Sequence, residues 1–264
     1  MEEYTEMNIG GRMKYYENAY RYYLPTKLPI IIRLDMRAGH TYTKKLAKPY
    51  DGIFHYVMIE TTKALCREIQ GAEMAYTQSD EISILIPNEA PQPYFDNNLQ
   101  KIVSITAAQA SVTFQNVMRE TIENYNCYTE RERDMFRDIY CSTLNKVMFD
   151  SRAFALPPNE IMNYFFWRQF DCRRNSISAL AREYFSQKEL KNKNCEEMLS
   201  MLRQKDIEWW TLYDWKKLGS CITKQEVEVP ICYNGVMKTV TRHVWQEDTP
   251  TPVFAIHCEE CDIL

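Results

Sequence analysis

The chain has 264 residues, a formal net charge of −4 and only 7 glycines, fewer than half the number expected from average composition. No arrangement of these glycines spells G-x-G-x-x-G or G-x-x-x-x-G-K-[ST], which excludes the Rossmann and P-loop phosphate sites. The negative charge excludes a global cationic surface, so a nucleotide or nucleic acid would have to be held by metals and local cationic side chains.

Strand and helix patterns alternate from the beginning of the chain. A polar, tyrosine-rich segment over residues 2–24 predicts a helix that covers another element. The apolar run of residues 29–35 predicts a buried strand that ends on Asp35. Apolar positions spaced by three and four over residues 54–71 predict an amphipathic helix. Two strands are then predicted at residues 74–77 and 82–86, around a polar tip.

A second amphipathic helix is predicted from Leu99 past Val117, and a further strand over residues 147–156. Between them lies a charged segment, residues 119–138, in which we expect a solvated helix or a lid. The order strand, helix, strand, strand, helix, strand is that of the split βαβ or ferredoxin-like (βαββαβ) arrangement. The sequence therefore predicts an α+β protein with a ferredoxin-like core.

The remainder of the chain has a different pattern. Pro157-Pro158 opens a long predicted helix that continues to Tyr184, and shorter helical pieces follow. Residues 221–229 and 236–244 predict a β-hairpin with Asn234-Gly235 as its turn. We expect a first domain over residues 1–156 and a helical and β-hairpin region over residues 157–264, with a soft boundary because no Gly/Ser linker separates them.

Asp35 and Asp80 are the residues to which the pattern assigns chemistry. In the split βαβ order the first strand and the hairpin strands are neighbours, so Asp35 can face Asp80 at the hairpin tip. Two carboxylates, with a third oxygen from Glu81 or a backbone carbonyl, suit Mg²⁺ ions that activate a hydroxyl and stabilise leaving pyrophosphate. Adjacent residues of a strand point to opposite faces, so either Asp80 or Glu81 ligates while the other orients the site or pairs with a cation. The alternative is structural, since carboxylates are common at hairpin tips.

Several segments in matching order carry a family resemblance. They are Ile32-Arg33-Leu34-Asp35-Met36-Arg37, Ala47-Lys48-Pro49-Tyr50-Asp51, Ala75-Tyr76-Thr77-Gln78-Ser79-Asp80-Glu81, Phe149-Asp150-Ser151-Arg152, Trp167-Arg168-Gln169-Phe170-Asp171-Cys172 and Phe185-Ser186-Gln187-Lys188-Glu189-Leu190. Together they cover most of residues 28–205 and resemble the tRNA(His) guanylyltransferase family, whose members are 3′-to-5′ nucleotide polymerases.

The resemblance implies a polymerase-palm-like catalytic core, two Mg²⁺ ions, ATP, GTP or other nucleoside triphosphates as substrates, tRNA or tRNA-like RNA as partner, and a homotetramer. It implies that Asp35, Asp80 and Glu81 are catalytic, and that the metals are held by Asp35, Asp80 and the backbone carbonyl of Met36, a position that is usually glycine in the family. The nucleotide-binding residues that it implies are Asp35, Met36, Arg37, Ala38, Gly39, His40, Lys48, Ser79 and Asp80. Lys48 matches the lysine associated with ATP activation of the RNA 5′ end.

One motif departs from the family pattern. Where the family has His-Ile-Asn-Asn-Leu-Tyr-Asn-Thr, this chain has Arg173-Arg174-Asn175-Ser176-Ile177-Ser178-Ala179-Leu180 and keeps only the first asparagine. This version is similar to the bacterial and phage-like branch, which resembles enzymes that repair 5′-truncated tRNAs by templated addition. The resemblance therefore implies templated 5′-end repair rather than the addition of one extra guanylate.

A group of basic residues follows the predicted core. Arg152, Arg168, Arg173 and Arg174 lie in a segment with only two acidic residues, which predicts a patch for RNA phosphates or the triphosphate. The alternative is a solvated helix face with one or two ion pairs. Asn175 and Lys188 join the predicted RNA or triphosphate contacts by resemblance. We expect Trp167, which follows Phe165 and Phe166, to lie in the core rather than to stack on a base.

Other features carry less specific predictions. Nine cysteines without a signal-peptide pattern, and no apolar run of membrane-spanning length, predict reduced thiols and a cytoplasmic location. The lone Cys258-Glu259-Glu260-Cys261 predicts a reduced tail rather than a zinc site, and His55 is expected to be structural. Two other functions stay open, namely a palm-fold nucleotide cyclase or dinucleotide synthase and a tRNA-binding protein without catalysis.

Overall fold

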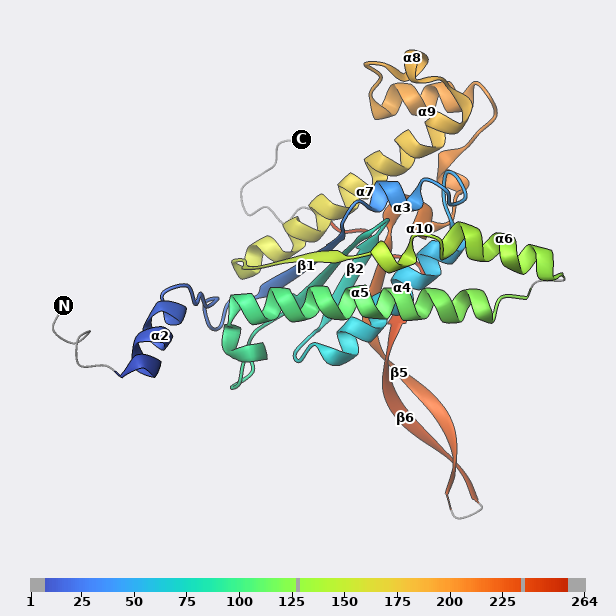
Figure 1. The fold of residues 1–264 in the computed structure, drawn as a ribbon. Helices are drawn as coiled ribbons and strands as arrows, with labels where there is room; N and C mark the ends of the chain where they lie inside the picture. The colour runs from blue at the N-terminus through green and yellow to red at the C-terminus, as the bar shows by residue number, and fades with distance from the viewer. Residues whose placement is uncertain (1–7, 127–128, 234–235, 256–264) are drawn as a thin grey trace.

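The computed structural model describes residues 8–126, 129–233 and 236–255 of the chain. Its centre is a six-stranded antiparallel sheet of order β4-β1-β3-β2-β5-β6 (Figure 1). The strands are β1 (Ile30–Met36), β2 (Met74–Gln78), β3 (Glu81–Ile86), β4 (Phe149–Ala155), β5 (Ser220–Tyr233) and β6 (Val236–Glu247).

Two long helices cover one face of the sheet and a third covers the other. The helices are α2 (Ile9–Asn18), α3 (Gly39–Thr43), α4 (Gly52–Glu68), α5 (Leu99–Glu123), α6 (Glu130–Tyr140), α7 (Ile161–Tyr184), α8 (Gln187–Leu190), α9 (Cys195–Arg203) and α10 (Asp214–Leu218). Short 3₁₀ turns lie at η1 (Tyr94–Asn97), η2 (Leu144–Lys146), η3 (Pro158–Glu160) and η4 (Trp209–Thr211). Helices α4 and α5 lie together on one face, and α7 crosses the opposite face (Figure 1).

The prediction of an α+β fold is confirmed, and β1, α4, β2, β3, α5 and β4 occur at the predicted segments. The first four strands of the sheet have the order β4-β1-β3-β2, in which β1 is central. The first part of β1, Ile30–Ile32, is buried on both faces and is therefore continuously apolar. Its second part alternates, with Arg33 and Asp35 half-buried and Leu34 and Met36 buried. Ile30 and Ile32 contribute to the core under α4 and α5, and Ile31 contributes to the core under α7.

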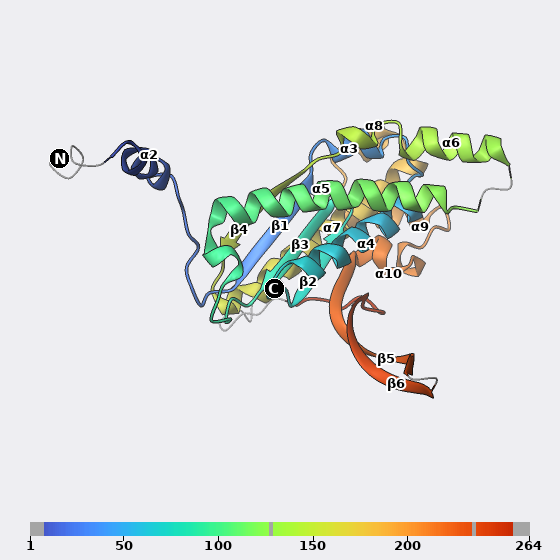
Figure 2. The same cartoon turned by 60° about the horizontal axis from the view of Figure 1, so that its bottom comes forward.

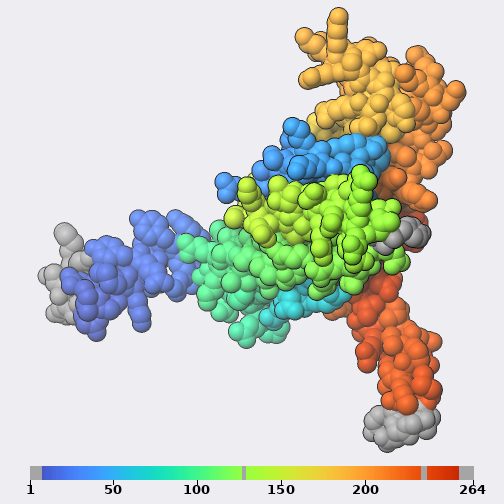
Figure 3. Space-filling model, turned by 45° about the vertical axis from the view of Figure 1, so that its right-hand side comes forward, coloured from blue at the N-terminus to red at the C-terminus, as the bar shows by residue number. Residues whose placement is uncertain are grey.

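The N-terminal segment differs from the prediction of a covering helix over residues 2–24. In the described part, α2 begins after the capping residue Asn8 and ends at Asn18. None of its residues is buried, and the helix lies away from the sheet (Figure 1), so that this segment protrudes from the body of the molecule (Figure 3). The prediction was wrong because the segment has tyrosines but no apolar stripe with which a helix could pack.

The predicted C-terminal hairpin is present and longer than expected. Strands β5 and β6 pair from Ile222 opposite Glu247 to the end of β5. The first residues of β5 pair with β2, from Ser220 opposite Thr77 to Thr223 opposite Met74. The hairpin therefore begins as part of the central sheet and then extends well beyond it (Figure 2). The predicted turn Asn234-Gly235 and the Cys258–Cys261 segment lie outside the described residues.

The charged segment after α5 forms a helix, α6, whose first turn is closed by a capping box between Thr129 and Glu132. This agrees with the expectation of a solvated helix, since Tyr140 is its one buried residue. No helix in the described ranges is both long and apolar enough to cross a bilayer.

Candidate active site

Asp35 and Asp80 come together where β1 ends and the β2–β3 hairpin turns. Asp35 is the last residue but one of β1, and its Cα lies opposite Glu81 of β3 and Asp150 of β4. The amide of Met36 donates a hydrogen bond to the backbone carbonyl of Asp80 (3.1 Å). The chain that follows Asp35 is thus tied to the hairpin tip, as the split βαβ order predicted.

Gly39 fixes the position of the Asp80 side chain. A Cβ added to Gly39 would lie 1.8 Å from Oδ2 of Asp80, which is too close for any side chain. The preceding residue, Ala38, has a left-handed backbone (φ 56°) that turns the chain back toward the hairpin tip. The glycine predicted to lie in the triphosphate segment therefore provides the space for a carboxylate.

The two carboxylates are only partly neutralised by the protein. The pKa of Asp35 is raised to about 6, first by burial and then by the negative charges of Asp80, Glu81 and Asp150. Burial also raises the pKa of Asp80, while a hydrogen bond from Ser79 and the nearby His40 act in the opposite direction. Arg33 acts on Asp35 in the opposite direction, so the charge of the pair is compensated only in part. Such a pair favours the binding of a cation, because a cation stabilises the ionised form of both groups.

The donor set fits Mg²⁺ bound together with a substrate. Within the described residues no group of three or more His, Cys, Asp and Glu side chains is arranged to hold a metal ion. Two carboxylates and the predicted backbone carbonyl of Met36 are therefore what this protein offers. Mg²⁺ is commonly held by one or two carboxylates, with phosphate oxygens and water completing its shell.

The Met36 side chain lies on the face of the sheet opposite to that of Asp35. The side chain is buried in the core beneath α4 and α5. Because Asp35 and Met36 are successive strand residues, their side chains point to opposite faces. The replacement of the family's usual glycine by methionine therefore adds volume to the core and leaves the carboxylate side of the strand unobstructed.

Glu81 pairs with cations. Its carboxylate accepts hydrogen bonds from Arg33 and from Nη1 of Arg168, the latter at 3.0 and 3.2 Å. Arg168 is only 4% exposed, so this pair lies inside the protein between β3 and α7. Of the two roles that the sequence left open for Glu81, the arrangement corresponds to pairing with a cation.

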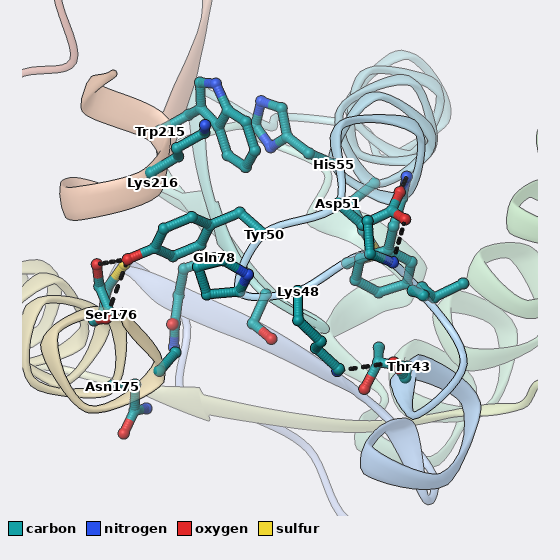
Figure 4. Close-up of a pocket in the computed structure, with 18 of the residues that line it drawn as sticks. Thr43, Lys48, Tyr50, Asp51, His55, Gln78, Asn175, Ser176, Trp215 and Lys216 are labelled. Carbon is teal, nitrogen blue, oxygen red and sulfur yellow. Dashed lines mark hydrogen bonds between the residues drawn. The ribbon is translucent and has the colours of Figure 1, made fainter. Parts of the chain in front are cut away.

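A cavity of about 210 Å³ lies beside the hairpin tip (Figure 4). Its lining comes from the segment between α3 and α4, from the end of β2, from α7 and from α10. The residues are Thr43, Leu46, Ala47, Lys48, Pro49, Tyr50, Asp51, Phe54, His55, Met58, Thr77, Gln78, Ser79, Cys172, Asn175, Ser176, Ala179, Trp215 and Lys216. Of the predicted site residues, Lys48, Ser79 and Asn175 are in this lining.

Polar contacts hold the walls of the cavity in place. The Tyr50 hydroxyl bonds to both the carbonyl (3.0 Å) and the hydroxyl (2.8 Å) of Ser176, which joins the α3–α4 segment to α7. Nζ of Lys48 donates to the Thr43 carbonyl (2.8 Å). An ammonium group has three donors, so Lys48 keeps donors for a ligand.

One end of the cavity combines flat rings with a cation. The His55 and Trp215 rings are stacked, with centroids 4.2 Å apart and planes 10° apart. Nζ of Lys216 lies 5.6, 5.5 and 5.2 Å from the ring centroids of Tyr50, Tyr213 and Trp215. Among the residues that the structure describes, Lys216 has no carboxylate partner. His55, expected to be structural, thus lines the cavity.

Sequence analysis missed Trp215, Lys216 and Asp51. Asp51 is buried and accepts hydrogen bonds from the amides of Ala47 (2.9 Å) and Phe54 (2.8 Å), so it shapes the segment that carries Lys48. Its signal was available, because Asp51 followed by Gly52 just before an apolar repeat is typical of a helix N-cap. Trp215 and Lys216 had no local signal, since only the fold brings them to this cavity.

The four predicted RNA-contacting arginines do not form one patch. Arg168 is buried on Glu81, and Arg174 pairs with Asp171 (2.7 Å). Arg173 lies over the Trp210 ring, 5.1 Å from its centroid. Arg152 lies on the edge strand β4, beside Asp150 (3.6 Å).

The remaining predicted residues lie at other points. Arg37 and His40 are exposed near Asp80, on either side of the turn that begins α3. Lys188 is exposed on α8, beyond the end of α7 (Figure 1). Trp167 is 50% exposed, so the expectation that it belongs to the core was wrong. Its neighbours Tyr164, Phe165 and Arg168 are among the buried positions of α7, and Trp167 falls outside that stripe.

An α+β sheet that presents a pair of carboxylates at a hairpin tip, next to a cavity lined by Ser79 and Lys48, is an arrangement compatible with a nucleotidyltransferase. A sequence profile of tRNAHis guanylyltransferases matches residues 10–157, more than half of the chain. The chain belongs to this family of nucleotidyltransferases, which confirms the resemblance drawn from its motifs.

Solved structures and curated relatives agree with this assignment. The chain is similar to a bacterial tRNA(His) guanylyltransferase-like protein in complex with ATP (40% identity, TM-score 0.75, covering 93% of this chain and 94% of that one). It is also similar to such a bacterial protein in complex with GTP (40% identity, TM-score 0.72, 93% of both chains). A probable tRNA(His) guanylyltransferase of Homo sapiens is 25% identical over 258 residues, covering 87% of this chain and 76% of the human protein.

Proposed function

We propose that this protein adds nucleotides in the 3′-to-5′ direction to the 5′ end of tRNA or tRNA-like RNA, with Mg²⁺ held by Asp35, Asp80 and the Met36 carbonyl. The observation that carries the proposal is the position of the carboxylate pair directly beside a cavity that contains Ser79, the neighbour of Asp80. The similarity to bacterial proteins in complex with ATP and GTP supports a nucleoside triphosphate as the occupant.

The lining of the cavity supports one orientation of that nucleotide. Its phosphates would lie toward Ser79 and Lys48, next to the acidic pair, where a point cation neutralises charge. Its base would lie toward the stacked rings of His55 and Trp215, with Lys216 at its edge. The predicted helical region of residues 157–264 would then complete the site of the predicted catalytic domain, because Asn175 and Trp215 come from that region.

The reaction consists of two balanced transfers. First, an oxygen of the RNA 5′-monophosphate attacks the α-phosphorus of ATP, pyrophosphate leaves, and the RNA end carries adenylate. Then the 3′-hydroxyl of an incoming nucleoside triphosphate attacks the RNA 5′ phosphorus, AMP leaves with the bonding electrons, and the hydroxyl proton passes to water. Bound Mg²⁺ would supply charge neutralisation and make the hydroxyl easier to deprotonate.

The protein's own groups have three tasks in this scheme. Asp35 and Asp80 hold the cations at the reacting phosphates. Lys48 and Ser79 hold the triphosphate of ATP, and Asn175 on α7 orients the nucleotide from the opposite wall. The Glu81 carboxylate keeps Arg168 and Arg33 in place below the site and therefore acts as a positioning residue. These tasks need no glycine-rich loop, in agreement with the composition.

The test uses a tRNA that lacks its first nucleotide and carries a 5′-monophosphate. Each labelled nucleoside triphosphate is offered separately, with ATP and Mg²⁺, and we expect incorporation only of the nucleotide that pairs with the opposing base. Asp35→Ala and Asp80→Ala should abolish incorporation while the circular dichroism spectrum stays unchanged. Full activity in either variant would refute the site, and incorporation regardless of the opposing base would refute templated repair.

Two control reactions separate this function from the alternatives. Without RNA, the protein should not turn over nucleoside triphosphates, whereas a cyclase or dinucleotide synthase would. In EDTA, incorporation should stop, while a protein that only binds tRNA would show the same binding and no incorporation under either condition.

A further inference from the structure

An exposed aromatic and cationic surface lies beside Asp35, outside the cavity. It is formed by Arg33 of β1, Arg152 of β4, and Trp167, Phe170 and Arg174 of α7, and we call it the Trp167 shelf. Trp167 is 50% exposed and Phe170 56% exposed. None of the five residues lines the cavity.

The Trp167 ring is held in place by buried charge. Cζ of Arg168 lies 3.6 Å from the centroid of the Trp167 ring, and Cζ of Arg33 lies 5.7 Å from it. Arg168 is itself fixed by Glu81 (3.0 Å) and lies 3.7 Å from Asp171. Because the guanidinium groups order the indole in advance, a ligand that stacks on it loses little conformational entropy.

The strand register puts this surface next to the acidic pair. Arg33 lies opposite Arg152 across the β1–β4 pair, and Asp35 lies opposite Asp150 two residues further along. Alternate residues of a strand share a face, so these four side chains project on the α7 side of the sheet, about 6–7 Å apart along the strand. A nucleotide that stacks on Trp167 would therefore have its phosphate within reach of Asp35.

The length of the shelf indicates whether a single nucleotide or a stretch of nucleic acid binds there. From Trp167 to Arg174 is seven helical residues, or about 10 Å along α7, which is longer than a single stacked base. Aromatic rings that alternate with cations along a surface are characteristic of proteins that bind single-stranded nucleic acid. Arg152 is 59% exposed, and its pair with Asp150 (3.6 Å) is itself exposed, so a phosphate can reach the guanidinium group. These features suit a short stretch of RNA.

We propose that the Trp167 shelf binds the 5′ end of the RNA substrate, with the terminal base stacked on Trp167 and the backbone phosphates on Arg152 and Arg174. This inference rests on the proposed function, in which the cavity is taken by a nucleoside triphosphate and the RNA end needs a place of its own on the other side of Asp35. Trp167 is then a positioning residue for the RNA end.

The test measures RNA binding rather than nucleotide addition. The probe is a synthetic acceptor-stem RNA that lacks its first nucleotide, with a 5′-monophosphate and a 5′-terminal 2-aminopurine, whose fluorescence falls on stacking. We expect wild-type protein to quench it, Trp167→Ala to lose the quenching and bind the RNA about tenfold more weakly, and Trp167→Phe to retain most of both. Tyr184→Ala is the matched control, since Tyr184 is 46% exposed on the same helix.

Each other result has a defined meaning. Unchanged RNA affinity and quenching in Trp167→Ala would overturn the proposal. Weaker binding of free GTP with unchanged RNA binding would also overturn it, because the shelf would then hold the incoming nucleotide. A change of molar mass in light scattering with unchanged RNA binding would overturn it in favour of a contact between two copies. If the protein binds the RNA as expected but adds no nucleotide, the shelf stands and the proposed function fails.

Discussion

Gly39 and Asp80 are packed so closely that the carboxylate occupies the space of a side chain at residue 39: a Cβ there would lie 1.8 Å from Oδ2. Gly39→Ala must therefore displace Asp80 or the turn that carries residue 39. Because a displacement of about 1 Å in a catalytic group can cost about 100-fold in rate, we expect nucleotide addition to fall by about that factor. Incorporation kinetics measure the loss.

Gly52 offers the matched control for this substitution. It begins α4, and an added Cβ would meet nothing within 4 Å. Gly52→Ala should keep full activity and raise the free energy of unfolding by up to about 1 kcal/mol, as expected for alanine in a helix. If Gly39→Ala adds nucleotides as fast as Gly52→Ala does, the Asp80 carboxylate has no catalytic task.

The buried arginine pair of Glu81 predicts a stability effect. Arg168→Met removes one partner of a buried carboxylate, so we expect the free energy of unfolding to fall by about 2–3 kcal/mol, since Arg33 still pairs with Glu81. Urea denaturation measures the change. In a double-mutant cycle, Glu81→Gln combined with Arg168→Met should cost clearly less than the sum of the two single changes. Additive effects would mean that the two side chains are not coupled.

Glu247 predicts a dependence of stability on pH. Burial acts to raise its pKa, but hydrogen bonds from His55 and Ser220 outweigh burial and the pKa is lowered from its ordinary 4.5. The unfolded chain therefore binds this proton more tightly, so ionised Glu247 stabilises the fold above pH 4.5 and the contribution is lost as the pH falls through the lowered pKa. Glu247→Gln should lose about 1 kcal/mol at pH 7.

Thermal unfolding of both proteins over a pH series measures this effect. The difference between wild type and Glu247→Gln should be largest near neutral pH and shrink in acid. A constant difference at every pH would mean that Glu247 stabilises the protein through packing and not through its charge.

The sequence predicted the central part of this molecule because the information there is local. The apolar run that ends on Asp35 and the hairpin that carries Asp80 have clear patterns of apolar residues. The ferredoxin-like order of elements then brings the two segments together. Trp167 was misassigned because three aromatic residues in succession do not reveal which of them faces the sheet. In the structure Phe165 packs on the sheet and Arg168 pairs with Glu81, and this rotation of α7 leaves Trp167 outside.

The cavity was beyond prediction for a different reason. Lys48 and Lys216 are far apart in sequence and meet because β5 joins the sheet beside β2, which brings the preceding α10 next to the α3–α4 segment. No local pattern encodes that pairing. For the same reason the predicted arginine patch separates in the structure, since neighbours such as Arg173 and Arg174 point to different sides of α7.

Lys216 provides the sharpest test of the base end of the cavity. Its ammonium group lies among three aromatic rings and has no carboxylate partner in the described chain. Lys216→Met keeps the length of the side chain and removes the charge, so we expect the Kd for GTP to rise about tenfold, the usual scale of a charge-assisted hydrogen bond. Isothermal titration with GTP in the absence of RNA measures it.

Lys217 is the control, because it has the same charge, the neighbouring position and a different environment. Its Nζ donates to the Trp210 carbonyl (2.9 Å) and pairs with Asp214 (3.4 Å), and it does not line the cavity. Lys217→Met should lower stability slightly and leave the Kd for GTP unchanged. If both variants weaken GTP binding equally, the effect is a general loss of positive charge and Lys216 does not touch the nucleotide. A loss in Lys216→Met that is larger for GTP than for ATP would mean that the ammonium group contacts O6 of guanine, because adenine carries an amino donor at that position.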